Sequence, residues 1–319
     1  MSSSRSWPGL PDEASNARME QRKRILVSGA SGLIGSAFCR MASAGSMEIT
    51  TLVRSRQAEG PRAIFWIPRD GFAETRQLEG FDAAVILNGA NISHRWTQRY
   101  RREIVSSRVE TTRSLCRLLA ATHRRPRVVL CASAVGIYGD GGDEVLTEES
   151  RPGAGFLAET CMAWEAASAP ARDAGIRVVH LRIGVVMSPG DAALAMMLPI
   201  FRAGLGGRLG SGCQWMSWIT LRDLVQGMLF LMKREDLSGP FNLVAPHPVR
   251  NRDFTRALAG AVHRPAILPA PAIALRVAFG QMADETMLAS QRAVPQRLLE
   301  AGYRFEDEEI EPALKGLLR

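Results

Sequence analysis

Short apolar runs alternate with helically spaced apolar positions along the first two thirds of the chain. Apolar runs that are bounded by turn residues predict buried strands, and we expect strands over 24–28, 49–53, 63–67, 83–87, 127–131 and 177–183. Apolar residues at helical spacing predict helices over 32–44, 98–121 and about 156–173. Short strands that alternate with helices predict an α/β fold with a doubly wound parallel sheet.

Glycines follow the first expected strand in the pattern G-x-x-G-x-x-G, at the mouth of the first expected helix. In a dinucleotide site the first glycine permits the tight turn, the second lets the backbone approach a pyrophosphate, and the third lets helix and strand pack closely. A merely structural turn is the alternative, and the strand–turn–helix context disfavours it. The pattern therefore predicts a Rossmann-like nucleotide site. Its residues are Gly29, Ser31, Gly32, Leu33, Ile34 and Gly35.

The end of the second strand predicts the choice of cofactor. An acidic residue there would bind the ribose hydroxyl of NAD, but the sequence reads Arg54-Ser55-Arg56. A guanidinium pairs well with the 2′-phosphate of NADP, so we expect NADP(H), held by Arg54 and Ser55, with NAD(H) as the possible alternative. The arginines could otherwise be solvated surface charge. Small residues after the fourth strand complete the expected site and are Asn88, Gly89 and Ala90.

The regular alternation of predicted strands and helices ends at about residue 184. Residues 204–212 are too rich in glycine for a helix and predict a loop. The segment WMSWI (215–219) is strand-like, and with a helix over 221–232 and the run 241–244 it is expected to return to the main sheet. We expect a nucleotide-binding domain over 24–245, with 184–218 contributing to a substrate cleft. The proline-punctuated remainder, 246–319, predicts a small, mostly helical C-terminal lobe.

Composition narrows the possible partners. The 319-residue chain has a net charge of +8, but its arginines are spread along the sequence, so we do not expect nucleic-acid binding. No apolar run approaches the roughly 20 residues that span a bilayer, and residues 1–23 are polar and without periodicity. We therefore expect a disordered leader, no membrane segment and a cytoplasmic location. The 5 cysteines and 5 histidines are scattered and show no C-x-x-C or helical ligand pair, so no metal is expected.

Several motifs together resemble the extended short-chain dehydrogenase/reductases, the NAD-dependent epimerase/dehydratase family, over residues 24 to about 245. They are the glycine pattern, AVGIYG at 134–139 and Leu181-Arg182 at a strand end. A subgroup of "epimerase family proteins" with its own C-terminal domain is closer still. Its hallmarks are Arg95-Trp96, Ser107-Arg108, Trp164-Glu165, 198–219, 239–242, 245–251 and 291–295. The resemblance implies a small-molecule or nucleotide-linked substrate, and a possible homodimer paired through the helices over 98–121 and 156–173.

The resemblance also implies a catalytic Ser or Thr, a Tyr, and a Lys four residues after that Tyr. The three tyrosines are Tyr100, Tyr138 and Tyr303, and none has a lysine four positions on. The family's tyrosine position falls on Leu157, its lysine position on Cys161, and its hydroxyl position on Ala134 with Ser133 beside it. The catalytic candidates that remain are Ser133, Tyr138 and Cys161, with Glu159 and His94 as weaker ones.

Two functions stay open at this point. The complete glycine pattern favours an NADP(H)-dependent oxidoreductase or epimerase. Its substrate cleft would be closed by residues 204–214 with Trp215, Ser217 and Trp218. The missing Tyr-x-x-x-Lys pair favours a non-catalytic NADP(H)-binding module that regulates or supports a partner protein. A fold alone does not choose between the two.

Overall fold

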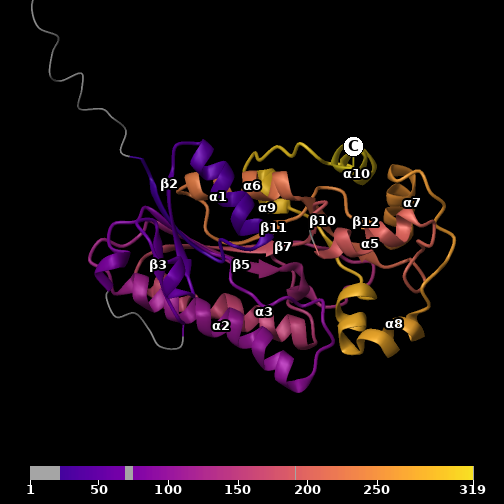
Figure 1. Ribbon diagram of the computed structural model, residues 1–319, viewed down its shortest axis with the longest axis horizontal. Coiled ribbons are helices and arrows are strands. Elements are labelled where there is room, and N and C mark those ends of the chain that lie inside the picture. The colour runs from indigo at the N-terminus through magenta and orange to yellow at the C-terminus, as the bar shows by residue number, and fades with distance from the viewer. Residues whose placement is uncertain (1–21, 69–74, 191, 319) are drawn as a thin grey trace, which may run out of the picture.

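A sheet of seven strands, all pairing in parallel, forms the centre of the molecule (Figure 1). The computed structural model describes residues 22–68, 75–190 and 192–318, so the expected leader lies almost wholly outside the described residues. The strand order is β11-β7-β5-β4-β1-β2-β3, which confirms the expected doubly wound, Rossmann-like sheet. The strands are β1 (Arg24–Ser28), β2 (Glu48–Val53), β3 (Ala63–Phe65), β4 (Ala83–Ile86), β5 (Val128–Ala134), β7 (Arg177–Ile183) and β11 (Gly239–Leu243).

Helices cover both faces of this sheet, and alternate side chains of each strand pack against one layer or the other. Ile25 and Val27 belong to the apolar cluster on one face, and Leu26 belongs to the cluster on the other. Because both faces are buried, the strands read as nearly continuous apolar runs. The first layer contains α1 (Leu33–Ala44) and α6 (Leu221–Lys233); the second contains α2 (Gln98–Ala120), α3 (Phe156–Ala166) and α4 (Ala169–Asp173).

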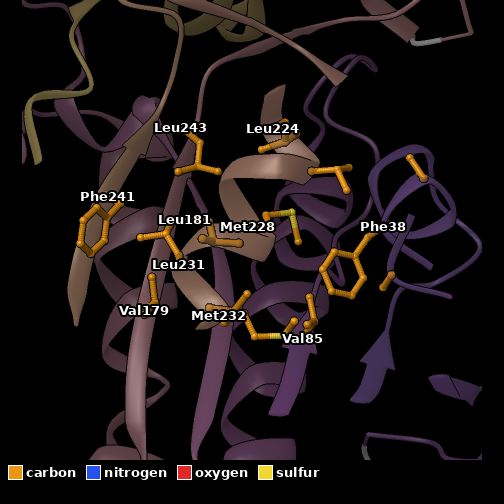
Figure 2. Packing of buried hydrophobic residues seen from close by; sticks show 14 of the residues in the cluster. Phe38, Val85, Val179, Leu181, Leu224, Met228, Leu231, Met232, Phe241 and Leu243 are labelled. Carbon is orange, nitrogen blue, oxygen red and sulfur yellow. The ribbon is translucent and has the colours of Figure 1, made fainter. Parts of the chain in front are cut away.

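The contact between α6 and the sheet shows how the first layer is built. Figure 2 shows Met228 and Leu231 of α6 beside Leu181 of β7, with Phe38 of α1 on the other side of the cluster. All four side chains are fully buried. Each therefore removes a large apolar surface from water, which stabilises the packing of the layer by roughly 1.5–3 kcal/mol per side chain.

The single helix expected over 156–173 is wrong, because the segment forms two helices with a break at Ala167 and Ser168. Pro170 lies in the first turn of α4, where its missing N–H costs no helical hydrogen bond. In the middle of a continuous helix the same proline would remove one such bond. The helix expected over 98–121 is confirmed within one residue by α2.

Short elements outside the main sheet lie mostly in the second half of the chain. They are β6 (Val145–Leu146), β8 (Val185–Met187), α5 (Ala192–Arg202), β9 (Trp215–Met216), β10 (Trp218–Thr220), β12 (Val249–Arg250), α7 (Asn251–Ala261), α8 (Ala272–Phe279), a π-helix (Ala283–Met287), β13 (Arg292–Ala293), α9 (Gln296–Glu300) and α10 (Ile310–Leu317). The expected helical C-terminal region is confirmed, and 204–212 is a loop as predicted.

The expectation that WMSWI returns to the main sheet is wrong. The segment divides into β9, which pairs antiparallel with β12, and β10, which pairs in parallel with β8. The break falls at Ser217, whose hydroxyl donates to Gln291 O at 2.7 Å and accepts the Ala293 N–H at 2.8 Å. The run 241–244 does return to the sheet as β11, beside β7.

One part of the C-terminal region packs back onto the main sheet. Leu298, Tyr303 and Phe305 belong to the same apolar cluster as α1 and α6. The buried carboxylate of Asp223, at the start of α6, accepts the N–H groups of Glu306 and Asp307 at 3.0 and 2.8 Å. Along the described ranges, no helix is both long and apolar enough to cross a bilayer.

The contact of α1 with the loop that follows β1 depends on the absence of a side chain at Gly35. A Cβ there would lie 2.2 Å from Gly29 O, so we expect Gly35→Ala to lower the free energy of unfolding by about 2 kcal/mol or more. Gly260→Ala in α7 is the matched control, because its Cβ would meet nothing within 4 Å and should stabilise the helix by about 0.5–1 kcal/mol. Urea unfolding of both variants measures this; equal stabilities would contradict the packing argument.

Candidate cofactor site and the buried polar network beside it

The glycine loop lies where the ends of three strands meet. Ser28, the last residue of β1, pairs with Leu52 of β2 and with Ile86 of β4. Since these strands are parallel, the residues that follow them emerge at one edge of the sheet, on either side of the point where the strand order reverses. The segments that follow β1, β2 and β4, which carry every residue assigned to the cofactor, therefore meet at this edge.

The three glycines have different reasons to lack a side chain. Gly29 has a φ of +81°, and a Cβ there would lie 2.8 Å from Leu87 C and O. Gly35 is excluded from carrying a side chain by the backbone of the loop itself. At Gly32, in contrast, the one described atom within 4 Å of an added Cβ is Gly29 O, at 3.5 Å. Gly32 is exposed, so the chain's own packing does not explain it, whereas the close approach of a phosphate would require a glycine there.

The N-terminus of α1 fits the pyrophosphate of a dinucleotide. Gly32 caps the helix without a side-chain hydrogen bond, and the first turn carries no acidic residue. The first backbone N–H groups of a helix have no partner within it and carry the positive end of the helix dipole. The N–H groups of Leu33 and Ile34, next to the exposed Ser31, are thus available to hold an anion.

Arg54 presents an uncompensated charge just after β2. Its side chain is exposed and takes part in no hydrogen bond or ion pair among the described residues. The neighbouring Arg56 is different, since its guanidinium lies 4.8 Å from the centre of the Phe65 ring. Ser55 donates to Gln57 Oε1 at 2.5 Å. Of the two arginines, Arg54 is therefore the one whose guanidinium does not contact an aromatic ring in the described part of the chain. It is free to turn toward the phosphate of a ligand.

The loop after β4 is held from two sides. Asn88 accepts a hydrogen bond from the Ser28 hydroxyl, and the Ala90 N–H donates to Ser107 Oγ of α2 at 2.9 Å. The guanidinium of Arg108 donates to Ala90 O at 3.0 Å. Sequence reasoning treated Ser107-Arg108 only as a family hallmark. The available signal was the position of two polar residues, Ser107 and Arg108, on the face of a predicted helix that packs on the sheet. Such residues are expected to bind the loop at the end of a neighbouring strand.

A buried ion pair organises the polar groups at the ends of β5 and β7. Arg182 donates from Nε to Glu165 Oε1 at 2.8 Å and from Nη2 to Oε2 at 3.0 Å, with side chains 8% and 13% exposed. Burial raises the pKa of Glu165, but the hydrogen bonds and charge of Arg182 outweigh it and hold the pKa below its usual range. Glu165 Oε1 also accepts the Ser133 hydroxyl at 2.7 Å, so Ser133 is tied to this pair.

Tyr138 lies in the same network. Its hydroxyl donates to Asn242 Oδ1 at 2.7 Å and accepts from Arg182 Nη1 at 3.0 Å. Burial raises the pKa of Tyr138, and the nearby Arg182 opposes this shift only in part. Asn242 in turn donates to Val294 O at 2.9 Å, so the network reaches the C-terminal region.

Cys161 completes the group of catalytic candidates around the end of β5. It is 4% exposed and lies on α3, where a Cβ added to Gly136 would be 4.0 Å from its sulfur and 3.6 Å from Leu157 Cβ. Burial raises the pKa of the Cys161 thiol to about 12, so the thiol is protonated at neutral pH. Ser133, Tyr138 and Cys161 thus gather at one place, all buried.

The weaker candidates lie elsewhere. Glu159 is exposed on α3, and His94 is exposed with its ring edge-on to Tyr100 at 5.5 Å. Of the residues expected to close the cleft, Trp218 is fully buried in the cluster around α5, α7 and α10, and the ring of Trp215 lies against the guanidinium groups of Arg250 and Arg292. Within the described ranges, no group of three or more His, Cys, Asp or Glu side chains is arranged to hold a metal ion.

The C-terminal region contacts α3 at its first turn. The carboxylate of Glu285 accepts the N–H groups of Phe156 and Leu157 at 3.1 and 2.7 Å. Beside this contact, Met282 packs with Phe156 and Trp96. The carboxylate acts as a helix cap supplied from about 130 positions away, which no local sequence pattern could have revealed.

We expect Glu165→Gln to destabilise the protein by about 3 kcal/mol at neutral pH, because it leaves Arg182 buried without a counter-ion. The folded pKa of Glu165 is lowered, so its contribution is present above its unfolded pKa and is lost as pH falls through the folded value. Unfolding curves should therefore show the full difference between the two proteins at neutral pH and a shrinking difference as the pH falls below about 4.5, the ordinary pKa of a glutamate. Glu235→Gln, which breaks an exposed pair with Arg127, is the control and should change stability by less than about 1 kcal/mol.

A brief treatment with iodoacetamide at neutral pH should modify Cys213 first, since it is exposed. Cys161, Cys116 and Cys131 are buried and should stay unmodified until the protein is denatured. Peptide mass spectrometry measures this order. Modification of Cys161 as fast as Cys213 would show that its thiol is open to solvent and more acidic than its surroundings imply.

Comparison with known proteins agrees with this geometry. Residues 25–244 match the NAD dependent epimerase/dehydratase family, and residues 270–317 match a domain of unknown function, DUF1731. The "Epimerase family protein Mb2239" of Mycobacterium bovis is 42% identical over 291 residues, covering 91% of this chain and 96% of the relative. The "Epimerase family protein MW0731" of Staphylococcus aureus is 34% identical over 301 residues, covering 93% and 99%.

Two solved structures share both fold and sequence with the chain. The human epimerase family protein SDR39U1 (isoform 2), solved with NADPH, superposes with a TM-score of 0.85 at 31% identity, covering 92% of this chain and 99% of that one. A nucleoside-diphosphate sugar epimerase from Corynebacterium glutamicum gives 0.76 at 36% identity, covering 93% of this chain and 58% of that one. With a dinucleotide-type glycine loop and a match across most of its length, the chain belongs to the NAD-dependent epimerase/dehydratase family, the extended short-chain dehydrogenase/reductases.

Proposed function

We propose that the protein is an NADP(H)-dependent oxidoreductase or epimerase that works without the Tyr-x-x-x-Lys pair of its family. The observation that carries this proposal is that the N-terminus of α1 has no side-chain cap and no acidic residue in its first turn, while Arg54 follows the neighbouring strand β2 with an uncompensated charge. NADP(H) fits both features, because its pyrophosphate and its 2′-phosphate are separate anions on one molecule. The human relative solved with NADPH supports the same cofactor.

Arg54 is the residue proposed to choose NADP(H) over NAD(H). A hydrogen bond to a charged group contributes about 1.5–3 kcal/mol, which corresponds to a preference of roughly 10- to 150-fold. The bare hydroxyl of NAD(H) offers no matching charge. The residues that follow β1 and β4, from Gly29 to Gly35 and from Asn88 to Ala90, would hold the parts of the cofactor that both forms share.

The proposed substrate is a small carbonyl compound or a nucleotide-linked sugar, bound between the edge of the sheet and the C-terminal region. In open α/β sheets, ligands bind outside the carboxyl ends of the strands. Here that edge faces the segment from Phe279 to Met287, which packs against Trp96, Phe156 and Leu157. The relative from C. glutamicum is described as a nucleoside-diphosphate sugar epimerase, which supports the nucleotide-linked class.

The bound cofactor would supply hydride transfer, and the chain's own residues would handle protons. Ser133, Tyr138 and Cys161 are the proposed groups. Burial keeps the phenol of Tyr138 and the thiol of Cys161 protonated at neutral pH, so each could act only as a proton or hydrogen-bond donor. A homodimer paired through α2 and α3 and a cytoplasmic location also stay predictions.

A non-catalytic NADP(H)-binding module is the second candidate. It is favoured by one observation, namely that the hydroxyls of Ser133 and Tyr138 already have partners inside the protein. Loss of reduced-nicotinamide absorbance on adding carbonyl or sugar-nucleotide substrates would exclude this candidate. Binding of NADPH without turnover of any such substrate, together with altered affinity for a partner protein, would favour it.

We expect the wild-type protein to bind NADPH more tightly than NADH, and Arg54→Ala to weaken NADPH binding at least about 10-fold with little change for NADH. Titration followed by cofactor fluorescence measures both affinities. Arg256→Ala, which removes an exposed arginine from α7, is the matched control and should leave both unchanged. Equal binding of NADPH and NADH by the wild type would remove the proposed selectivity, and binding of neither would remove the proposed function.

A further inference from the structure

Arg108 is a half-buried cation at the edge of the sheet where the cofactor residues meet. It projects from α2, and its guanidinium donates to Ile104 O at 3.2 Å and to Ala90 O at 3.0 Å. It also lies 5.2 Å from the centre of the Trp164 ring. A Cβ added to Gly89 would be 3.0 Å from its central carbon, so the loop after β4 passes directly over the guanidinium.

No carboxylate of the described residues forms an ion pair with Arg108. Burial lowers the pKa of Arg108, and the nearby thiol of Cys161 and phenol of Tyr100 oppose this shift only in part. Arg182, which is buried, differs because Glu165 binds it through both oxygens. Even partial removal of a cation from water costs free energy unless another group compensates its charge.

The guanidinium also has unused hydrogen-bonding capacity. Arginine carries five N–H donors, and among the described residues those of Arg108 make two hydrogen bonds, both to backbone carbonyls. The donors lie between the ends of two adjacent strands, since Ala90 follows β4 and Cys161 packs on Gly136, which follows β5. The sequence motifs also assign Cys161 to the position of the family's lysine. In this chain α3 therefore provides no positive charge at that position.

We propose that Arg108 binds the ribose–phosphate portion of NADP(H) on the nicotinamide side, and so supplies from α2 the positive charge that α3 lacks. The inference rests on the proposed function. The two arginines then bind different parts of the cofactor. Arg54, which follows β2, binds the 2′-phosphate, and Arg108, near the ends of β4 and β5, binds the nicotinamide half. Glycine at 89 leaves room for the guanidinium beneath the loop.

Two ligands separate this role from a merely structural one. NADPH contains both halves of the cofactor, whereas 2′,5′-ADP contains only the adenosine half with its 2′-phosphate. Arg108→Met keeps the length of the side chain and removes its charge, and we expect it to weaken NADPH binding at least about 10-fold. Binding of 2′,5′-ADP should change less than about 2-fold, which also shows that the variant is folded. Arg108→Lys restores the charge and should recover part of the NADPH affinity.

Arg113→Met is the matched control, because Arg113 is exposed on the same helix, and it should alter neither affinity. Calorimetric titration of the full-length proteins gives all the values. An equal loss for both ligands in Arg108→Met would assign the residue to holding the 88–90 loop and overturn the proposal, as would unchanged NADPH binding. If the wild type binds 2′,5′-ADP and NADPH and only the Arg108 effect is missing, this inference fails alone; if the wild type binds neither ligand, the proposed function fails with it.

Discussion

The bidentate ion pair between Arg182 and Glu165 is the contact on which the arrangement around the sheet edge depends. It joins β7 to α3, and through Ser133 and Tyr138 it extends to the end of β5. A buried ion pair contributes little net stability when both partners are present, but it strongly disfavours any arrangement that separates them. The pair therefore fixes how α3 sits against the strands more than it adds to the free energy of folding.

That constraint explains why the residues suggested by the family's chemistry are buried here. The groups around the end of β5 satisfy one another, and their partners reach as far as Asn242 of β11 and the backbone of Val294. In this chain, polar groups beside the cofactor edge connect the sheet to the C-terminal region. Polar side chains of the kinds used in catalysis can thus have a structural role, and membership of the fold family alone does not make them catalytic.

The nucleotide-binding half could be predicted from the sequence because its signals are local. The apolar run of β1, the spacing of Gly29 and Gly35, and the apolar face of α2 are all patterns of residues that are close together in the chain. The break between α3 and α4 was missed because helical spacing continued across Pro170, and WMSWI was assigned to the wrong sheet because its partners lie far along the sequence.

The site was only partly predictable for the same reason. The glycine loop and Arg54 follow strand ends, where a sequence pattern identifies them directly. Arg108 sits in the middle of a helix, and its importance arises from the missing counter-ion, which appears only once α3 and the loop after β4 are placed. Glu285 could not be predicted either, since its contact with the start of α3 joins residues about 130 positions apart.

The return of residues 298–305 to the main sheet affects how the chain emerges from the ribosome. The cluster beneath α1 and α6 includes Leu298, Tyr303 and Phe305, so the nucleotide-binding half lacks part of its own core until these residues have been synthesised. A nascent chain that already contains every strand of the sheet still exposes an apolar face of α6. The core of the nucleotide-binding half is thus completed only late in translation, and until then part of its apolar surface remains in contact with water.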